Sequence, residues 1–278
     1  MKAADPAPHI VIKPPSRWAP INVREVWEFR DLLTRFAIRD LKLRYRQTAL
    51  GVIWVVLQPL LAAGIFSFVF GRVADLPSDG VPYFVFAYVG MMAWMAFSST
   101  LTKISGSLVG NSQLISKIFF PRLVLPLSTL GSTLVDFAVA LAMGAVVIAI
   151  AGVSPTLAII TMPFWFTLTM LLATGLGLIA AALMVPYRDI AYILPVATQL
   201  LLYGTPIAYS LSAVPESAQW IIQLNPLAGA IEGFRWSLLD TTPPSAAAAS
   251  WSTVAAIGLF LIGSLVFTRM ERKFADVI

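Results

Sequence analysis

The sequence predicts an all-α integral membrane protein, and three features lead to that prediction: its composition, its charge-free segments and the placement of its cations. Hydrophobic residues make up 58% of the 278 residues and charged residues only 12%, and the mean hydropathy is +0.82. A soluble domain carries about 25% charged residues, so composition alone excludes that class. The segment from Gln47 to Gly71 has no charge. As a helix it would reach roughly 37 Å, enough for a hydrocarbon core of about 30 Å.

The chain begins with two segments that are expected on the cytoplasmic side. Residues 1–22 are Pro-rich, which predicts a disordered tail. In residues 23–40, Val26, Phe29 and Leu33 recur at helical spacing, and charged residues occupy the other faces. This pattern predicts an amphipathic interface helix on the inner membrane surface. Packing of the same helix against a soluble partner is the alternative.

Six membrane spans are expected in the remainder of the chain. They cover approximately residues 47–71, 81–102, 123–151, 156–185, 190–209 and 250–268. The charge-free segment from Phe137 to Tyr187 is too long for one helix, and the sequence AGVSP at 151–155 divides it. Prolines inside the spans, such as Pro59 and Pro195, are tolerated where neighbouring helices satisfy the freed carbonyl groups.

The cations set the expected orientation. Of the 19 Lys and Arg residues, only Arg72 and Arg235 fall in loops on the side opposite the termini. The positive-inside rule therefore places both termini in the cytoplasm, with a transmembrane domain over residues 41–270 and a C-terminal segment over 271–278. The net charge of +5 is thus typical of membrane orientation, and nucleic acid is not expected as a partner.

The sequence lacks the motifs of enzymes and of nucleotide hydrolysis. It contains no Walker loop, no H-E-x-x-H and no G-x-S-x-G. With no cysteine and one histidine, neither a metal site nor thiol catalysis is expected. Asp136 is the one acidic residue within a span. A charge there costs about 2.5–3.5 kcal/mol, so we expect it to line a pathway or to bond a neighbouring helix. The chain is therefore interpreted as a pore or a transport subunit that draws energy from another chain.

Two loops on the cytoplasmic side are candidates for that contact. Residues 104–120 place apolar side chains near one helical face, and Pro121 would end a helix there. Such a helix can insert into a groove of a soluble partner, although an ordinary interfacial loop is the alternative. The loop after the fourth expected span has Arg188 and Asp189 as its charges, and it is either a second contact or a simple turn.

Four motifs resemble one protein family in their order and spacing. They are LKLRYRQTALGVIWVVLQPL (41–60), GNSQLISKIFFPRLVLPLS (110–128), VPYRDI (185–190) and LNPLAGAIEGFRWSLL (224–239). Together they resemble the membrane subunit of type-2 ABC exporters, and most closely the permeases that export O-antigen, capsular polysaccharide or teichoic acid. The resemblance covers residues 23–273.

The resemblance implies a homodimer of six-helix subunits in the cytoplasmic (inner) membrane, joined by two copies of a separate ATPase that binds ATP and Mg. The cargo would be a lipid-linked glycan, with drugs or lipids as the alternative. Residues 104–120 would be the coupling helix that contacts the ATPase. Residues 212–239 would form a pair of re-entrant periplasmic gate helices. No cofactor is expected on this chain itself.

The resemblance and the chemistry of the cargo together nominate site residues. Those expected to contact the ATPase are Gly110, Asn111, Leu114, Ile115, Lys117, Phe119, Pro121, Arg122, Tyr187, Arg188 and Asp189. Those expected at the lipid headgroup, with plain membrane anchoring as the alternative, are Arg39, Lys42, Arg44 and Arg46. Aromatic rings can stack on sugar C–H faces and glutamines can bind hydroxyl groups. The expected path residues, with lipid-facing or packing roles as the alternative, are Trp54, Gln58, Phe66, Phe70, Tyr88, Trp94, Gln199 and Tyr203. The expected gate residues are Asn225, Pro226, Glu232 and Arg235, of which the last two are spaced to pair on one helical face.

Overall fold

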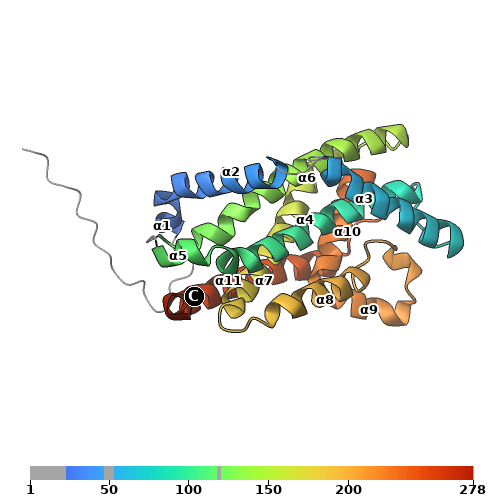
Figure 1. Cartoon of the computed structure of the whole chain (residues 1–278). Coiled ribbons are helices and arrows are strands. Elements are labelled where there is room, and N and C mark those ends of the chain that lie inside the picture. The colour runs from blue at the N-terminus through green and yellow to red at the C-terminus, as the bar shows by residue number, and fades with distance from the viewer. Residues whose placement is uncertain (1–22, 47–52, 118–119, 278) are drawn as a thin grey trace, which may run out of the picture.

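The computed structural model describes residues 23–46, 53–117 and 120–277, and within them every regular element is a helix. The helices run lengthwise in an elongated bundle (Figure 1). Within the described residues, five segments are long and apolar enough to cross a membrane: Ile53–Val73, Tyr83–Gly110, Val124–Ile150, Leu157–Met184 and Ala246–Glu271. The prediction of an all-α membrane protein is confirmed at this level.

The element bounds follow the chain order. The long helices are α3 (Ile53–Phe66, continued by a π-helical turn over Ser67–Val73), α4 (Tyr83–Gly110), α6 (Val124–Ile150), α7 (Met162–Met184, preceded by a 3₁₀ turn over Leu157–Thr161) and α11 (Ala246–Val277). The shorter ones are α1 (Val23–Glu28), α2 (Arg30–Arg46), α5 (Ser112–Lys117), α8 (Ile190–Tyr203), α9 (Glu216–Leu224) and α10 (Pro226–Leu239), with a 3₁₀ turn over Leu211–Ala213.

Helix α4 forms the centre of the bundle, and α3, α6, α7 and α10 pack around it. Its middle turns are closed to solvent, and Tyr88 and Phe97 are both 0% exposed. Small residues let α7 and α11 come close together. A Cβ atom on Gly175 would lie 2.5 Å from the Leu259 carbonyl oxygen, and one on Gly263 would collide with the Gly175 backbone. This close approach is typical of helix pairs in membranes, where association depends on backbone contact rather than on water exclusion.

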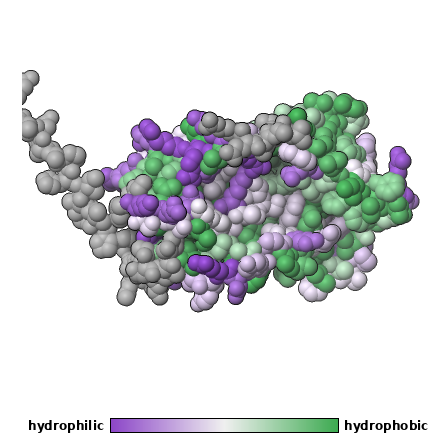
Figure 2. Space-filling view, viewed as in Figure 1, coloured by the Kyte–Doolittle hydropathy of each residue, from purple (hydrophilic) through white to green (hydrophobic). Residues whose placement is uncertain are grey.

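The surface divides into a polar and an apolar part. Hydrophilic residues gather at the end that carries α1, α2 and α5, and hydrophobic residues cover much of the opposite half (Figure 2). Large apolar side chains are exposed on α3 and α8, including Leu61, Ile65 and Leu200. A soluble monomer rarely exposes apolar surface on this scale, whereas lipid or a partner helix covers it in a membrane protein.

The fifth expected span is shorter than predicted. Helix α8 has 14 residues and therefore reaches about 21 Å, less than the core of a bilayer. The sequence predicted an apolar span over residues 190–209, but the chain turns after Tyr203. Gly204 caps the helix and Pro206 follows it. Arg235 on α10 binds the carbonyl oxygens of Pro206 and Ile207, so the non-helical backbone there is satisfied by a side chain instead of by a continuing helix.

Two further boundaries differ from the sequence prediction. Helix α4 continues to Gly110 instead of ending at 102, so the helix expected over 104–120 is reduced to the six residues of α5. Helix α2 continues to Arg46, so the cations expected at the start of the first span lie on the last turns of this helix. The first expected span begins within residues 47–52, which lie outside the described residues.

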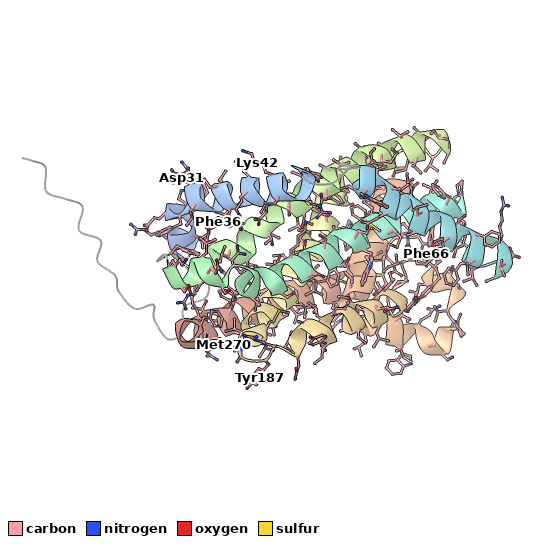
Figure 3. All side chains as sticks on the ribbon, in the orientation of Figure 1. Asp31, Phe36, Lys42, Phe66, Tyr187 and Met270 are labelled. Atoms are coloured by element: carbon pink, nitrogen blue, oxygen red, sulfur yellow. The ribbon has the colours of Figure 1, made fainter. Side chains whose placement is uncertain are left out.

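Helix α2 lies alongside the first half of α6 (Figure 1). The apolar face predicted from the sequence packs on the chain itself: Phe36 is 8% exposed and its ring lies 5.8 Å from that of Phe120. Lys42 projects away from the bundle, on the opposite side of α2 from Phe36 (Figure 3). The helix is therefore amphipathic as predicted, and its apolar side packs in a cluster shared with residues of α5 and α11.

Candidate functional site

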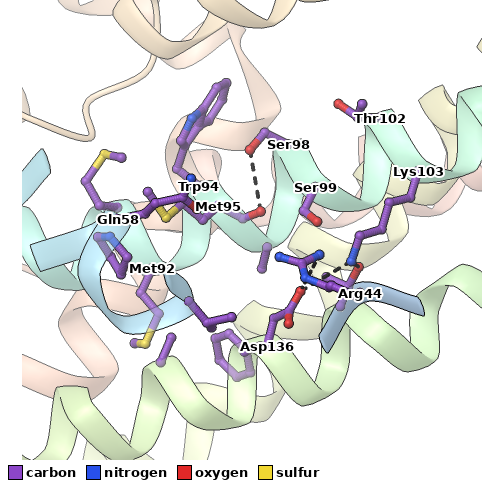
Figure 4. A pocket seen from close by; sticks show the side chains of 17 residues that line it. Arg44, Gln58, Met92, Trp94, Met95, Ser98, Ser99, Thr102, Lys103 and Asp136 are labelled. Atoms are coloured by element: carbon purple, nitrogen blue, oxygen red, sulfur yellow. Dashed lines mark hydrogen bonds and ion pairs between the residues drawn. The ribbon is translucent and has the colours of Figure 1, made fainter. Parts of the chain in front are cut away.

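A cavity of about 580 Å³ opens between α3, α4 and α6, next to the last turn of α2 (Figure 4). Its two ends differ in chemistry. At one end lie Arg44, Lys103 and Asp136. At the other lie the indole of Trp94 and a group of apolar side chains that includes Met91, Met92 and Met95. A cavity of this kind can hold a molecule that is anionic or polar at one end and apolar at the other.

The charged end is built around the Asp136 carboxylate. Its Oδ2 lies 2.9 Å from Nη1 of Arg44 and 3.3 Å from Nζ of Lys103. The Tyr45 hydroxyl donates to Oδ1 at 2.5 Å. Asp136 lies near the middle of α6 and is only 12% exposed, so these three donors offset the cost of holding a charge there. Burial and the bond to Asp136 raise the pKa of the Tyr45 hydroxyl to about 12, so Tyr45 remains a donor at neutral pH.

Lys103 is held by groups on a neighbouring helix. Its ammonium group donates to Oγ of Ser132 at 2.8 Å and to Oγ1 of Thr133 at 3.3 Å, both on α6, besides approaching Asp136. All three donor positions of the ammonium group therefore have partners. The cluster joins α2, α4 and α6, because Arg44 and Tyr45 come from α2 and Lys103 from α4.

The apolar end offers aromatic and thioether surface. Trp94 stacks on Phe97 with 5.5 Å between ring centroids and is 5% exposed. Gln58, beside Pro59 on α3, adds an amide to the cavity wall. Methionine side chains are flexible and polarizable, so this wall can adapt to more than one shape.

At the end of the bundle that carries α5, two side-chain contacts connect the α5 region to distant elements. Arg39 Nη2 on α2 donates to Oδ1 of Asn111 at 3.0 Å. The Arg122 backbone N–H donates to Oε1 of Glu271 on α11 at 3.0 Å, and its guanidinium contacts the Glu271 carbonyl. Ile115 is 8% exposed and anchors α5 in the apolar cluster with Phe36. Helix α5 is therefore tied at both of its ends to helices that run along the bundle.

Residues 110–117 also surround a surface hollow of about 430 Å³, lined by Gly110, Asn111, Ser112, Gln113, Leu114 and Lys117. Lys117 is exposed at the end of α5, and Tyr187, Arg188 and Asp189 are exposed in the turn between α7 and α8. Pro121 and Leu114 are partly buried, and Phe119 lies outside the described residues. Both predicted loops thus offer side chains at the same end of the bundle (Figure 3).

The loop after α8 is held by two helices, α10 and α4. Arg235 on α10 is 2% exposed; its Nη2 donates to the carbonyls of Pro206 at 2.9 Å and Ile207 at 2.8 Å, and its Cζ lies 3.7 Å from the Phe86 ring centroid. The Tyr83 hydroxyl on α4 donates to the Ala208 carbonyl at 2.5 Å. The loop is therefore fixed through its own carbonyl groups.

Asp79 and Asn225 fix the two ends of the same region. Oδ1 of Asp79 accepts from the hydroxyls of Ser210 at 2.7 Å and Ser212 at 3.1 Å. Asn225 caps α10, since its Oδ1 accepts the Leu227 N–H at 3.0 Å, and its amide donates to Thr205 at 2.9 Å. Pro226 occupies the first turn of α10, a position that does not require a backbone N–H donor.

One predicted pair does not form. Glu232 and Arg235 were expected to pair across one turn of α10, but the described residues show no ion pair between them within 4.0 Å. Arg235 instead reaches the two carbonyls of the α8–α9 loop. The prediction rested on helical spacing alone, which does not indicate where a long side chain finds its acceptors.

The predicted headgroup cations separate into different roles. Arg44 lines the cavity, whereas Arg39 is bound to Asn111 and Asp40. Lys42 is exposed, and the side chain of Arg46 lies outside the described residues. The three cations whose side chains are described, Arg39, Lys42 and Arg44, therefore have different surroundings.

The predicted path residues also separate. Gln58 and Trp94 line the cavity. Tyr88 is 0% exposed and donates to the Ala140 carbonyl at 2.8 Å, so this structure favours the packing role that was the alternative for it. The remaining predicted path residues lie on the outer surfaces of α3 with its π-helical turn and of α8, in positions that are exposed or half-buried: Trp54, Phe66, Phe70, Gln199 and Tyr203.

Sequence reasoning missed Lys103, Tyr45 and Asp79 as site residues. Lys103 was taken as a loop cation, but α4 is longer than expected and carries it beside α6. The sequence feature that could have indicated Lys103 is Asp136, because a lone carboxylate within a span requires a cationic partner. Lys103 follows directly after the second expected span, and Asp136 lies in the third.

Five apolar segments long enough to cross a membrane define, within the described residues, a multi-pass integral membrane protein, and three of these segments line the cavity. Residues 32–239 match the family described as ABC-2 type transporter, and the chain belongs to that family. It is 31% identical over 249 residues to the O-antigen export system permease protein RfbA of Klebsiella pneumoniae, with 89% of this chain and 95% of the relative covered. It is 28% identical to the protein of the same name from Myxococcus xanthus, with 92% and 98% covered. The polysialic acid transport protein KpsM of Escherichia coli is 24% identical, with 70% and 76% covered.

Proposed function

We propose that this chain is the permease subunit of an ATP-driven exporter that carries a lipid-linked polysaccharide from the inner to the outer face of the cytoplasmic membrane. The observation that carries the proposal is the similarity to O-antigen export permeases over nearly the whole of both chains. The polysialic acid transport protein, a more distant relative, supports a polysaccharide as cargo. A cavity with one charged and one aromatic end suits a cargo that joins an anionic headgroup to sugars and a hydrocarbon tail.

The chain works as a non-enzymatic transport subunit, and ATP and Mg bind to a separate ATPase. Helix α5 is the segment that seats in the ATPase, because it is short, exposed at Lys117 and tied to α2 and α11. A displacement of α5 would therefore be passed to two long helices. Tyr187, Arg188 and Asp189 form a second contact at the same end.

Two copies of the chain and two ATPase subunits form the working assembly. The exposed apolar faces of α3 and α8 support pairing of two copies within the membrane. Helix α8, followed by the loop that Arg235 holds and by α9 and α10, forms a sixth crossing with re-entrant gate helices at the outer face. Both termini then lie in the cytoplasm, as the distribution of cations indicates.

A second candidate is an exporter of lipids or apolar drugs. The cluster of Met91, Met92 and Met95 in the cavity wall favours it, since thioether walls adapt to varied apolar molecules. A glycan exporter requires a glycan-bearing cargo, whereas this alternative does not. The two are distinguished by whether loss of the chain removes surface polysaccharide or instead sensitises cells to apolar compounds.

The test is deletion of the chain in its native host, followed by quantification of polysaccharide at the cell surface and of lipid-linked polysaccharide inside. We expect surface polysaccharide to disappear and its lipid-linked precursor to accumulate at the inner face. Restoration by the wild-type chain, but not by a chain that lacks residues 112–117, would tie export to α5. Unchanged surface polysaccharide in the deletion strain would reject the proposed cargo.

A further inference from the structure

The charged end of the cavity contains two cations and one carboxylate. Arg44 and Lys103 share Oδ2 of Asp136, at 2.9 and 3.3 Å, and no other charged side chain lines the cavity in the described part of the structure. Asp40, an acidic neighbour on α2, is bound by Arg39 at 2.9 Å. The charged side chains that line the cavity therefore carry one more positive than negative charge, and the one carboxylate among them comes from α6.

Hydroxyl groups extend this cationic end along α4. Ser98, Ser99 and Thr102 line the cavity on the turns between Trp94 and Lys103. The Ser98 hydroxyl donates to the Met95 carbonyl at 3.4 Å, and Ser99 and Thr102 add two further hydroxyl groups to the wall beside the ammonium and guanidinium groups (Figure 4). A group with several anionic oxygens, such as a phosphate or diphosphate, is the acceptor that such a donor set binds most strongly.

We propose that Arg44 and Lys103 form a subsite for a phosphate or diphosphate group of the cargo, and that Asp136 occupies this subsite as an internal counter-ion until the cargo displaces it. This inference rests on the proposed export function, because it assigns the anionic end of the exported molecule to one end of the cavity. The apolar and aromatic end then receives the adjoining hydrocarbon or sugar.

The geometry keeps a hydrogen-bond donor on Asp136 and two hydroxyl acceptors on Lys103 during the exchange. Asp136 keeps the Tyr45 hydroxyl on its Oδ1 when Arg44 and Lys103 turn to another anion. Lys103 keeps Ser132 and Thr133. The subsite is therefore held in place by groups that the cargo does not need to displace, which is the condition for a preorganised site.

Occupancy of the subsite also bears on α5. Arg44 lies five positions after Arg39 on α2, and Arg39 binds Asn111 at the start of the α5 segment. An anion that draws Arg44 away from Asp136 acts on the same rigid helix that holds Asn111. The presence of cargo in the cavity is thereby linked to the position of the ATPase-contacting segment.

The test is equilibrium binding to the full chain in nanodiscs of zwitterionic lipid, with three probes: a polyprenyl diphosphate, the corresponding polyprenol and inorganic diphosphate. The variants are Lys103→Gln, Lys103→Arg and Asp136→Asn. Arg72→Gln serves as the control, because it removes an exposed charge from the π-helical turn after α3, outside the cavity. Lys103→Gln leaves Asp136 paired with Arg44 and Tyr45, so the fold should tolerate it.

We expect the diphosphate lipid to bind more tightly than the polyprenol, and Lys103→Gln to weaken its binding by about tenfold to a hundredfold. Lys103→Arg should restore most of the loss, Asp136→Asn should tighten binding, and Arg72→Gln should change nothing. Competition by inorganic diphosphate alone would show that the phosphate groups carry the recognition, and absence of competition that the attached lipid is required; both results support the subsite when they depend on Lys103.

Equal binding of diphosphate lipid and polyprenol, or binding that Lys103→Gln does not alter, would overturn the subsite. This result is separable from the proposed function. A Lys103→Gln strain with normal surface polysaccharide and unaltered lipid binding removes the subsite and leaves export intact. If deletion of the chain leaves surface polysaccharide unchanged but the chain still binds diphosphate through Lys103, the subsite is supported and the proposed export function is rejected.

Discussion

Substitution of Arg235 by Met should loosen the loop that follows α8. The guanidinium is 2% exposed, donates hydrogen bonds of 2.9 and 2.8 Å to two carbonyls, and lies 3.7 Å from the Phe86 ring centroid. Methionine fills a similar volume, but it leaves the carbonyls of Pro206 and Ile207 without these donors. A buried acceptor that loses its partner costs about 1–3 kcal/mol, and a cation–π contact adds roughly 1–2 kcal/mol when desolvated.

The expected loss for two acceptors and one cation–π contact is therefore about 3–8 kcal/mol of the free energy of unfolding, less what the protein regains because the cost of burying the guanidinium disappears. A net loss of about 2–4 kcal/mol follows, since breaking a buried charged network is destabilising even where the network itself contributes little. The measurement is denaturant or thermal unfolding of the purified chain in detergent. Arg72→Met is the matched control, because Arg72 is exposed and its loss should change stability by about 0.5 kcal/mol or less.

Arg235→Lys separates charge from geometry. Lysine keeps the cation but lacks the planar group that reaches two carbonyls and lies over the Phe86 ring, so it should recover only part of the stability. A loss below about 0.5 kcal/mol for Arg235→Met, equal to that of the Arg72 control, would show that the Arg235 contacts do not fix the loop, and the account of why α8 ends at Tyr203 would be wrong.

Three further substitutions test separate parts of the structure. Arg39→Ala and Asn111→Ala should show a coupling energy of about 0.5–2 kcal/mol in a double-mutant cycle of stability, because they share one hydrogen bond, and additive effects would exclude that contact. Gly90→Ala should destabilise the protein by about 1–3 kcal/mol, because the added Cβ would lie 2.7 Å from both Arg235 Nη2 and the Ile207 carbonyl oxygen. Gly106→Ala is the control: it has open space around it, so it should be neutral or stabilising. Equal effects of the two substitutions on the free energy of unfolding would contradict this packing. Tyr88→Phe should lose about 1 kcal/mol with its bond to the Ala140 carbonyl while leaving export of surface polysaccharide unchanged, and abolished export in a stably folded variant would return Tyr88 to the path.

The sequence was most informative where hydropathy decides structure. The third and fourth spans were expected at 123–151 and 156–185, and the described segments are Val124–Ile150 and Leu157–Met184. A charge-free run with a Gly-Pro break has few alternatives in a bilayer, because every backbone group must be satisfied within a helix. The end of α8 was predictable only in part. Gly204 and Pro206 mark a break in the helix, but the group that satisfies the carbonyls after the break, Arg235, is about thirty residues away in the sequence.

The candidate site shows the same division. Arg44, Gln58 and Trp94 were selected for their chemistry near the first two spans, and they line one cavity. The contacts that organise the charged end cross long separations, since Lys103 and Asp136 are 33 positions apart and Tyr45 and Asp136 are 91 positions apart. Such pairs depend on how the helices pack, which hydropathy and residue spacing in a single sequence do not indicate. The sequence therefore indicated that Asp136 lines a pathway or bonds a neighbouring helix, but not which residues it contacts.

The most direct test of the account is transport by the purified chain in proteoliposomes, with and without its ATPase subunit. Lipid-linked polysaccharide would be supplied on the side that carries α5, and its appearance on the other side would be followed after addition of ATP and Mg. We predict transport only when chain, ATPase and ATP are all present, and its loss when residues 112–117 are replaced by a flexible segment. ATP-dependent transport by the chain alone, or transport that persists without α5, would contradict the central claim that a separate ATPase drives this permease through α5.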